Sequence, residues 1–213
     1  MVTWVDGEVL RRDALTPAIA ASLGRGLATL GQAFRDFDHC GQARELDWDL
    51  QRALCLRERT PFIGDAPVRA EVEGVLEEFE RDGLPLFSRL RRQFIHNDAN
   101  PDNVLSNRRD RAVTGFIDFG DVVEAPLVAD VAIAGSYLRD VRDPLRLLAP
   151  FVSAYHEVTP LTAEELPEGV AEIAVTIQRY AYGNRPATIR AMFEAVRKDE
   201  QGKDQPGGRI TDL

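Results

Sequence analysis

Cysteines, lysines and long apolar runs are scarce in this 213-residue chain, and each shortage narrows its possible roles. The two cysteines, Cys40 and Cys55, lack the spacing of a metal site and fit a reducing, cytoplasmic location better than a disulfide-rich secreted domain. No run of about 18 apolar residues occurs, so we expect no membrane-spanning segment. The N-terminus reaches a charged residue, Asp6, too soon for a signal peptide.

The charge balance argues against one large class of partner. The chain has 35 acidic and 26 basic residues, a formal net charge of −9. Nucleic acids need a basic face on the protein, so no nucleic-acid partner is expected. The acidic balance is compatible with a cationic small molecule, although it is usually a matter of solubility. The 44% hydrophobic content fits one large or two small globular domains and leaves the oligomeric state open.

A β-hairpin is predicted in the middle of the chain. An extended pattern begins at Val104, residues 107–110 are polar and turn-forming, and the apolar and β-branched residues 112–117 form the return strand. A hairpin brings its two ends together. We therefore expect Asn103, where the first strand begins, and Asp118, where the second ends, to meet at one mouth.

A polar loop precedes this hairpin. Residues 94–96 form a short apolar strand, and Pro101 excludes a helix interior after it. The resulting order is His-x-Asp98-x-x-x-x-Asn103, followed by Asp118 on the next strand. In phosphoryl transfer, the first aspartate of such a pattern accepts the proton of the attacking hydroxyl, while the asparagine and the second aspartate hold Mg²⁺. Two carboxylates and one amide oxygen are hard ligands that suit Mg²⁺.

Each half of this pattern also has a simpler interpretation. Asp98 and Asn103 are residue types that cap the backbone of turns. His96 fits an internal brace of the loop better than a chemical role. Asp130, in the first turn of an expected helix, has two open roles: it braces the loop by hydrogen bonds, or it only favours the helix N-terminus by its charge.

The ordered pattern resembles the aminoglycoside phosphotransferase family, which includes choline kinase-like enzymes and is related to protein kinases. The matching residues are His96, Asp98 and Asn103, then Ile117-Asp118, then Asp130-Val131-Ala132. The IDFGD form of the second element is similar to the hydroxylysine kinase-like branch. Asn97 departs from the pattern, because the family more often has a small residue at this position.

The resemblance implies an α+β, mainly helical fold: a kinase-like C-terminal lobe with a catalytic β-hairpin and with the N-terminal nucleotide lobe largely absent. Residues 1–10 would form the last strand of the nucleotide lobe and the hinge, 11–198 the catalytic lobe, and 199–213 a disordered tail or linker. Trp4, Val5 and Asp6 would then lie near the hinge that binds the nucleotide base. The alternative for the tryptophan is packing against the first helix.

The resemblance also implies roles for the polar residues. Asp98 would be the catalytic base and Asn103 and Asp118 the metal ligands, with His96, Asp121 and Asp130 supporting the loop. A water-mediated metal contact is an equal alternative for Asp121. The implied reaction moves the γ-phosphoryl group of ATP or GTP, with Mg²⁺, to a hydroxyl of a small, amine-bearing metabolite that is hydroxylysine-, aminoglycoside- or choline-like.

One part of a kinase is missing from the sequence. No glycine-rich phosphate loop precedes the expected hinge, and the only lysines are Lys198 and Lys203, too far along the chain to bind phosphates from an N-terminal lobe. Two explanations stay open: the C-terminal lobe of a longer enzyme, or a pseudokinase-like module that binds a small molecule or partner. A metal-dependent phosphohydrolase that uses the same carboxylates is a third reading.

Helices are predicted on both sides of the hairpin. Thr16 followed by Pro17 signals a helix start. Apolar residues then recur at helical spacing: Ile19, Leu23, Leu27, Leu30, Phe34 and Phe37. Further helices are expected from Asp47 to about Arg57 with Trp48 in the core, from Val68 to Gly83, over 85–92, from Pro126, from Asp143 with a kink or break at Pro150, from the capping box Thr162–Glu165, and over 169–182 and 186–198. Loops are expected over 60–67 and 119–126, and an edge strand over 2–5.

Overall fold

The computed structural model of the chain describes residues 4–39, 45–46, 49–107, 109, 111–138, 143, 145–162 and 164–165. The chain divides into two compact units, one made of Met1–Leu46 with Leu90–Ile177 and the other of Asp47–Arg89 with Gln178–Leu213. The expected core anchor Trp48, the expected helices over 169–182 and 186–198, and the predicted tail 199–213 lie outside the described residues.

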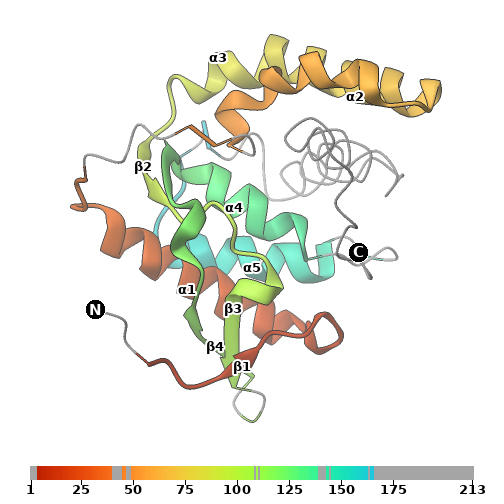
Figure 1. The fold of residues 1–213 in the computed structure, drawn as a ribbon. Coiled ribbons are helices and arrows are strands. Elements are labelled where there is room, and N and C mark those ends of the chain that lie inside the picture. Colours follow the sequence, from red (N-terminus) through yellow and green to blue (C-terminus); the bar gives the residue numbers. More distant parts are fainter. Residues whose placement is uncertain are drawn as a thin grey trace. The chain divides into compact units, whose positions relative to one another are not determined.

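Two long helices pack against each other in the first unit (Figure 1). Helix α1 spans Pro17–Phe34 and helix α5 spans Leu145–Val158. The predicted start of α1 is confirmed, because the Thr16 side chain accepts a hydrogen bond from the Ile19 N–H at 3.3 Å. A Cβ atom on Gly24 would lie 2.1 Å from the carbonyl oxygen of Phe151, so only glycine allows this approach.

Helix α5 is continuous, and the break considered at Pro150 is absent. An interior proline removes one helix hydrogen bond and costs about 3 kcal/mol. The apolar face of α5 repays that cost, since Leu148, Phe151 and Tyr155 are almost fully buried and each buried side chain contributes about 1.5–3 kcal/mol.

The predicted hairpin is confirmed. Strand β3 (Val104–Asn107) pairs antiparallel with β4 (Ala112–Phe116), and Val104 lies opposite Phe116. A third strand, β1 (Glu8–Val9), pairs with β3 on its other side. Residues 4–7 are not a strand, so the expected edge strand over 2–5 is wrong for Trp4 and Val5, its two described residues. Val5 instead packs over Gly115, whose missing Cβ would lie 2.6 Å from the valine side chain.

A second, two-stranded sheet leads into the polar loop. Strand β2 (Arg92–Ile95) pairs antiparallel with β5 (Val123–Pro126), with Ile95 opposite Val123. Strand β5 corrects the prediction of a loop over 119–126. This strand forms because it pairs with β2 and buries Val123 and Ala125. The turn-forming residues of the segment do not reveal this stabilisation, because it depends on a distant strand.

Helix α4 (Leu127–Ser136) follows β5 directly, as predicted from Pro126. It joins α1, α5 and the start of the hairpin in one apolar core. Fully buried members of that core are Leu27, Ala28, Val104, Val131, Ala134 and Phe151. A short 3₁₀ turn, η1 (Arg12–Ala14), connects β1 to α1.

The second unit departs further from the predictions. The helix expected to end near Arg57 is a 3₁₀ helix, η3, that runs over Leu50–Phe62 and so covers the start of the expected loop. Asp49 caps this helix: its side chain accepts the Gln51 N–H at 2.9 Å.

Helix α2 spans Ala66–Glu78, and the helical segment that it begins does not end at Gly83 as predicted. It continues through a π-helical turn, η4 (Phe79–Gly83), into the short α3 (Leu84–Phe87). Gly83 has right-handed helical angles, φ −78° and ψ −52°, and not the left-handed angles of a helix-ending glycine. No helix within the described ranges is both long and apolar enough to cross a membrane.

Candidate active site

Asp130 fastens the loop that follows β2. This residue of the first turn of α4 is buried, and its carboxylate accepts the backbone N–H of His96 at 3.2 Å and that of Asn97 at 2.9 Å. Burial raises the pKa of Asp130, against the effect of these two hydrogen bonds. The sequence left two roles open for Asp130, and these contacts match the first, which is to hold the loop by hydrogen bonds.

His96 ties the same loop to the end of the hairpin. Its ring is fully buried, and its Nδ1 accepts the Asp98 N–H at 3.3 Å. Nε2 lies 3.0 Å from the carbonyl oxygen of Ile117 and, as the remaining ring nitrogen, donates its hydrogen there. These contacts match the predicted internal brace.

Two amides hold the Asp98 carboxylate. Asn100 Nδ2 donates to Oδ1 at 2.8 Å, and Asn103 Nδ2 donates to Oδ2 at 2.7 Å. Asp98 is half-buried, and burial raises its pKa. The negative charge of Asp121 raises the pKa further, while the two amides and His96 oppose the rise.

Asn100 is the residue that the sequence reading missed. It supports Asp98 and also begins the 3₁₀ turn η5 (Pro101–Asn103) by accepting the Asp102 N–H at 2.7 Å. The available signal was an asparagine directly before a proline, the order of a cap followed by a first helical residue.

Asp118 lies at the hairpin mouth that was predicted for it. The Ile117 N–H donates to the Asn103 carbonyl at 3.0 Å, so Asn103 and Asp118 stand at the same end of β3 and β4. Asp118 is exposed and left-handed, with φ 60°, and its Oδ1 accepts the Gly120 N–H at 3.2 Å in the turn η6 (Phe119–Asp121). A non-glycine residue in this conformation is often part of a functional site.

The donor set at this mouth fits Mg²⁺. Asn103 uses its amide nitrogen on Asp98, which leaves its carbonyl oxygen for a cation, and Asp118 adds an exposed carboxylate. No group of three or more His, Cys, Asp or Glu suited to a metal occurs in the described part of the chain. Two protein oxygens are typical of a magnesium site that phosphates and water complete, rather than of an all-protein cage.

Of the predicted hinge residues, Trp4 and Asp6 are exposed and Val5 is half-buried. Trp4 is 88% exposed and its indole N–H donates to Asp6 at 2.8 Å, so the alternative that it packs against the first helix is wrong. Val5 contacts Gly115 on β4. No observation tests a hinge role for Trp4, Val5 and Asp6, which stays a prediction.

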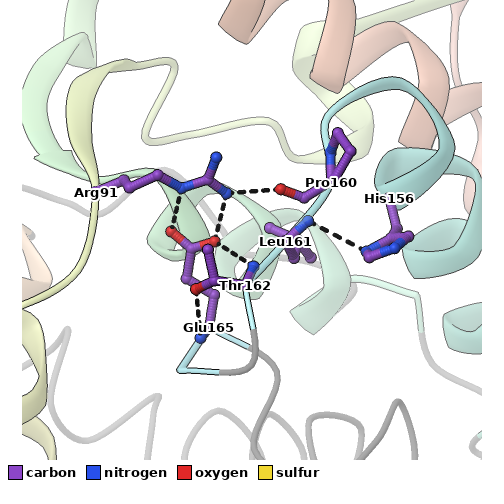
Figure 2. A network of polar contacts seen from close by, with 6 residues as sticks. All are labelled: Arg91, His156, Pro160, Leu161, Thr162 and Glu165. Atoms are coloured by element: carbon purple, nitrogen blue, oxygen red, sulfur yellow. Dashed lines mark hydrogen bonds and ion pairs between the residues drawn. The ribbon is translucent and has the colours of Figure 1, made fainter.

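A second polar network, shown in Figure 2, anchors the chain just before β2. Arg91 donates to both carboxylate oxygens of Glu165 and, at 2.8 Å, to the Pro160 carbonyl. Thr162 and Glu165 form the predicted capping box, with reciprocal bonds of 2.9 and 3.3 Å. Leu161 donates its N–H to His156 Nδ1 at 3.1 Å. Burial opposes the charge of Glu165, but Arg91 and Thr162 prevail and lower its pKa.

Comparison with known sequences identifies relatives. The model of the family described as "Phosphotransferase enzyme family" matches residues 1–173. Hydroxylysine kinase from Xenopus laevis is 25% identical over 179 residues, which cover 78% of this chain and 48% of the relative. Hydroxylysine kinase from Mus musculus is 25% identical over 177 residues, with 78% and 47% covered. The chain thus spans about half the length of the curated relatives that it matches.

Solved structures show the fold. Choline kinase from Cryptosporidium parvum aligns with a TM-score of 0.57 at 14% identity over 93% of this chain and 69% of that one. The GDP complex of aminoglycoside 2′-phosphotransferase-IIIa aligns with a TM-score of 0.56 at 21% identity, with the same shares covered. The expected α+β fold with kinase-like neighbours is confirmed, and the assignment of lobes stays a prediction.

Proposed function

The chain belongs to the phosphotransferase enzyme family, and on that premise we propose that it transfers the γ-phosphoryl group of ATP or GTP to a hydroxyl of a small, amine-bearing metabolite. Its relatives include hydroxylysine kinases, a choline kinase and aminoglycoside phosphotransferases, one of them in complex with GDP. The net charge of −9 suits an acceptor that carries an amine. In this proposal residues 1–10 end a nucleotide lobe and form the hinge, and 11–198 form the catalytic lobe.

The observation that carries the proposal is the state of Asp98. Its carboxylate is half-buried, is oriented by the amides of Asn100 and Asn103, and has a raised pKa. A carboxylate of this kind suits a general base. The acceptor hydroxyl attacks the γ-phosphorus and passes its proton to Asp98, while the bond from the γ-phosphorus to the bridging oxygen breaks and the nucleoside diphosphate leaves.

The other site residues have supporting roles in this proposal. Asn103 and Asp118 would hold Mg²⁺, and the ion would neutralise charge that develops on the phosphates. His96 and Asp130 keep the loop in place by the contacts described above. Trp4, Val5 and Asp6 would lie along the nucleotide base, and Asp121 would act on Asp98 through its charge.

A non-catalytic binding module, or pseudokinase, is the second candidate. It would use the same site residues to bind a ligand, without transfer of a phosphoryl group. A phosphohydrolase is the third, because it would use the same carboxylates without any acceptor.

The deciding experiment is phosphotransfer by the 213-residue chain. Mg²⁺ with ATP or GTP is supplied together with hydroxylysine, choline, homoserine or an aminoglycoside. Asp102→Asn is the matched control for Asp98→Asn, because Asp102 is an exposed carboxylate of the same loop. Turnover that survives in the control and is lost in Asp98→Asn supports the kinase. Phosphate release that needs no acceptor indicates the phosphohydrolase, and ligand binding without turnover indicates the binding module.

Nucleotide binding tests the metal site separately. We expect Asp118→Ala to abolish the Mg²⁺-dependent part of ATP or GTP binding, measured by calorimetry with and without the ion. An unchanged Mg²⁺ dependence in a folded variant would contradict the role proposed for Asp118.

A further inference from the structure

Asn97 carries a buried polar atom that nothing described so far uses. Its side-chain Nδ2 has no hydrogen-bond partner in the described part of the chain, and the residue is only 5% exposed. Asn97 directly precedes Asp98, the proposed base. Buried amide nitrogens are nearly always satisfied, so an unsatisfied one beside a candidate base needs an explanation.

The loop does not need this side chain to keep its shape. The backbone N–H of Asn97 is already held by Asp130 at 2.9 Å. His96, on one side, is fixed by Asp130 and Ile117, and Asp98, on the other side, is fixed by His96 and two amides. The neighbours of Asn97 therefore hold the loop, and its Nδ2 adds no hydrogen bond within the described part of the chain.

The backbone conformation does not explain the asparagine either. Asn97 is left-handed, with φ 63°, and asparagine tolerates this region better than most residues. Glycine adopts it with no steric cost and would leave no buried donor without a partner. A side chain that is worse than glycine for the described part of the protein is expected where it meets a partner outside that part, such as a bound ligand.

We propose that the Asn97 amide is a specificity-determining contact, which donates a hydrogen bond from Nδ2 to an oxygen of the acceptor substrate. This inference rests on the proposed function. Asp98 faces the acceptor hydroxyl in that function, and Asn103, which leads to the phosphates, hydrogen-bonds to Asp98 from the hairpin side of the loop. Asn97 lies on the β2 side, so the acceptor is the reactant assigned to it. The acceptors that benefit carry a second oxygen, from a hydroxyl, carbonyl or carboxylate.

Asn97→Gly is the informative variant, because it removes the amide and keeps the left-handed backbone. Arg111→Gly is the matched control: Arg111 is another left-handed residue, φ 49°, exposed in the turn between β3 and β4. With an accepted substrate, we expect Asn97→Gly to raise the KM of the acceptor by about 3- to 10-fold, the effect of one neutral hydrogen bond. The kcat and the KM of the nucleotide stay near wild type, and Arg111→Gly changes none of the three.

Asn97→Asp tests the direction of the hydrogen bond. It keeps the size of the side chain but replaces the donor by an oxygen that repels another oxygen. We expect a larger rise in acceptor KM than in Asn97→Gly, and the largest rise for acceptors with a carboxylate. A rise confined to the nucleotide KM, or no rise in either variant, would overturn the proposal.

Thermal unfolding without ligands separates a binding role from a structural one. If Nδ2 has no partner in the free protein, the melting temperature of Asn97→Gly equals or exceeds that of the wild type. A lower melting temperature with an unchanged acceptor KM overturns the proposal, because the amide is then a structural contact. If the wild type shows no turnover, calorimetric binding of the same acceptors decides: weaker binding by Asn97→Gly upholds the contact while the kinase proposal fails. If the wild type turns over and Asn97→Gly leaves the acceptor KM unchanged, the kinase proposal stands and the Asn97 contact fails. A wild type that neither binds nor turns over these acceptors overturns both proposals.

Discussion

Glu165 and Asp98 are two carboxylates in the same unit whose surroundings shift their pKa values in opposite directions. Glu165 is buried and bonded to the Arg91 guanidinium and to the Thr162 N–H, and its pKa is lowered (Figure 2). Asp98 is held by two neutral amides, forms no ion pair with arginine or lysine in the described part of the chain, and has a raised pKa. Arg91 balances the charge of the anchoring carboxylate, whereas no arginine or lysine in the described residues balances that of Asp98, the proposed base.

Asp130 shows that a carboxylate without an arginine or lysine partner is not for that reason a reactive group. Its pKa is also raised, yet it is buried and both oxygens are used by backbone N–H groups. Asp98 differs because it is half-buried at the mouth of the hairpin, where a ligand can reach it. Accessibility and a raised pKa together distinguish the candidate base from the brace.

The largest expected effect is that of Asp98→Asn on turnover. We expect kcat to fall by about 10²–10⁴-fold, the usual contribution of a general base. The melting temperature at neutral pH should not fall, because the ionised form of Asp98 is disfavoured in the folded state. Steady-state kinetics and thermal unfolding measure the two effects. A large loss of stability would place Asp98 with Glu165 as an anchoring residue and break the comparison.

Removing the Asp130 carboxylate, which holds the loop, should lower turnover less than Asp98→Asn does. Asp130→Ala leaves the N–H groups of His96 and Asn97 without an acceptor, which costs about 1–3 kcal/mol of stability for each such group. A displaced loop should also lower kcat by about 10²-fold. Asp130→Asn retains one acceptor oxygen and should be intermediate in both measurements. Wild-type kinetics in Asp130→Ala would mean that the loop keeps its geometry without the carboxylate.

Glu165→Gln should affect stability and spare the chemistry. We expect the loss of the charged hydrogen bonds to Arg91 to cost about 1–3 kcal/mol, with kcat of the folded protein unchanged. The folded pKa is below the unfolded value of about 4.3, so this stabilisation is present above that pH and is lost as the pH falls through the folded pKa. Urea unfolding at several pH values measures it. The exposed neighbour gives the control, Glu164→Gln, which should show neither effect.

Features that depend on neighbours in the sequence were predictable. The hairpin follows from β-branched residues on both sides of a polar turn, and it alone brings Asn103 to the side of Asp118. The cap at Thr16 follows from the proline directly after it, and the capping box from Thr162 and Glu165, three positions apart. The polar pattern of the candidate site could be read from the sequence for the same reason: most of it lies in one loop and one hairpin.

Features that depend on distant partners were not predictable. Strand β5 exists through its pairing with β2, and α5 survives Pro150 through its burial against other elements. Arg91 and Glu165 are 74 positions apart, so no local pattern links them. The two roles of Asp130 could be separated only by seeing its contacts with His96 and Asn97.

The smallest expected effect is a shift in the pH dependence of turnover in Asp121→Asn. Activity needs ionised Asp98, so kcat/KM falls as the pH drops through the pKa of Asp98. The charge of Asp121 raises that pKa, and its removal should move the fall to lower pH while the rate at neutral pH stays nearly unchanged. Asp102→Asn, in the same loop, should leave the profile in place. A loss of activity at every pH, with weaker dependence on Mg²⁺, would instead assign Asp121 to the metal through water.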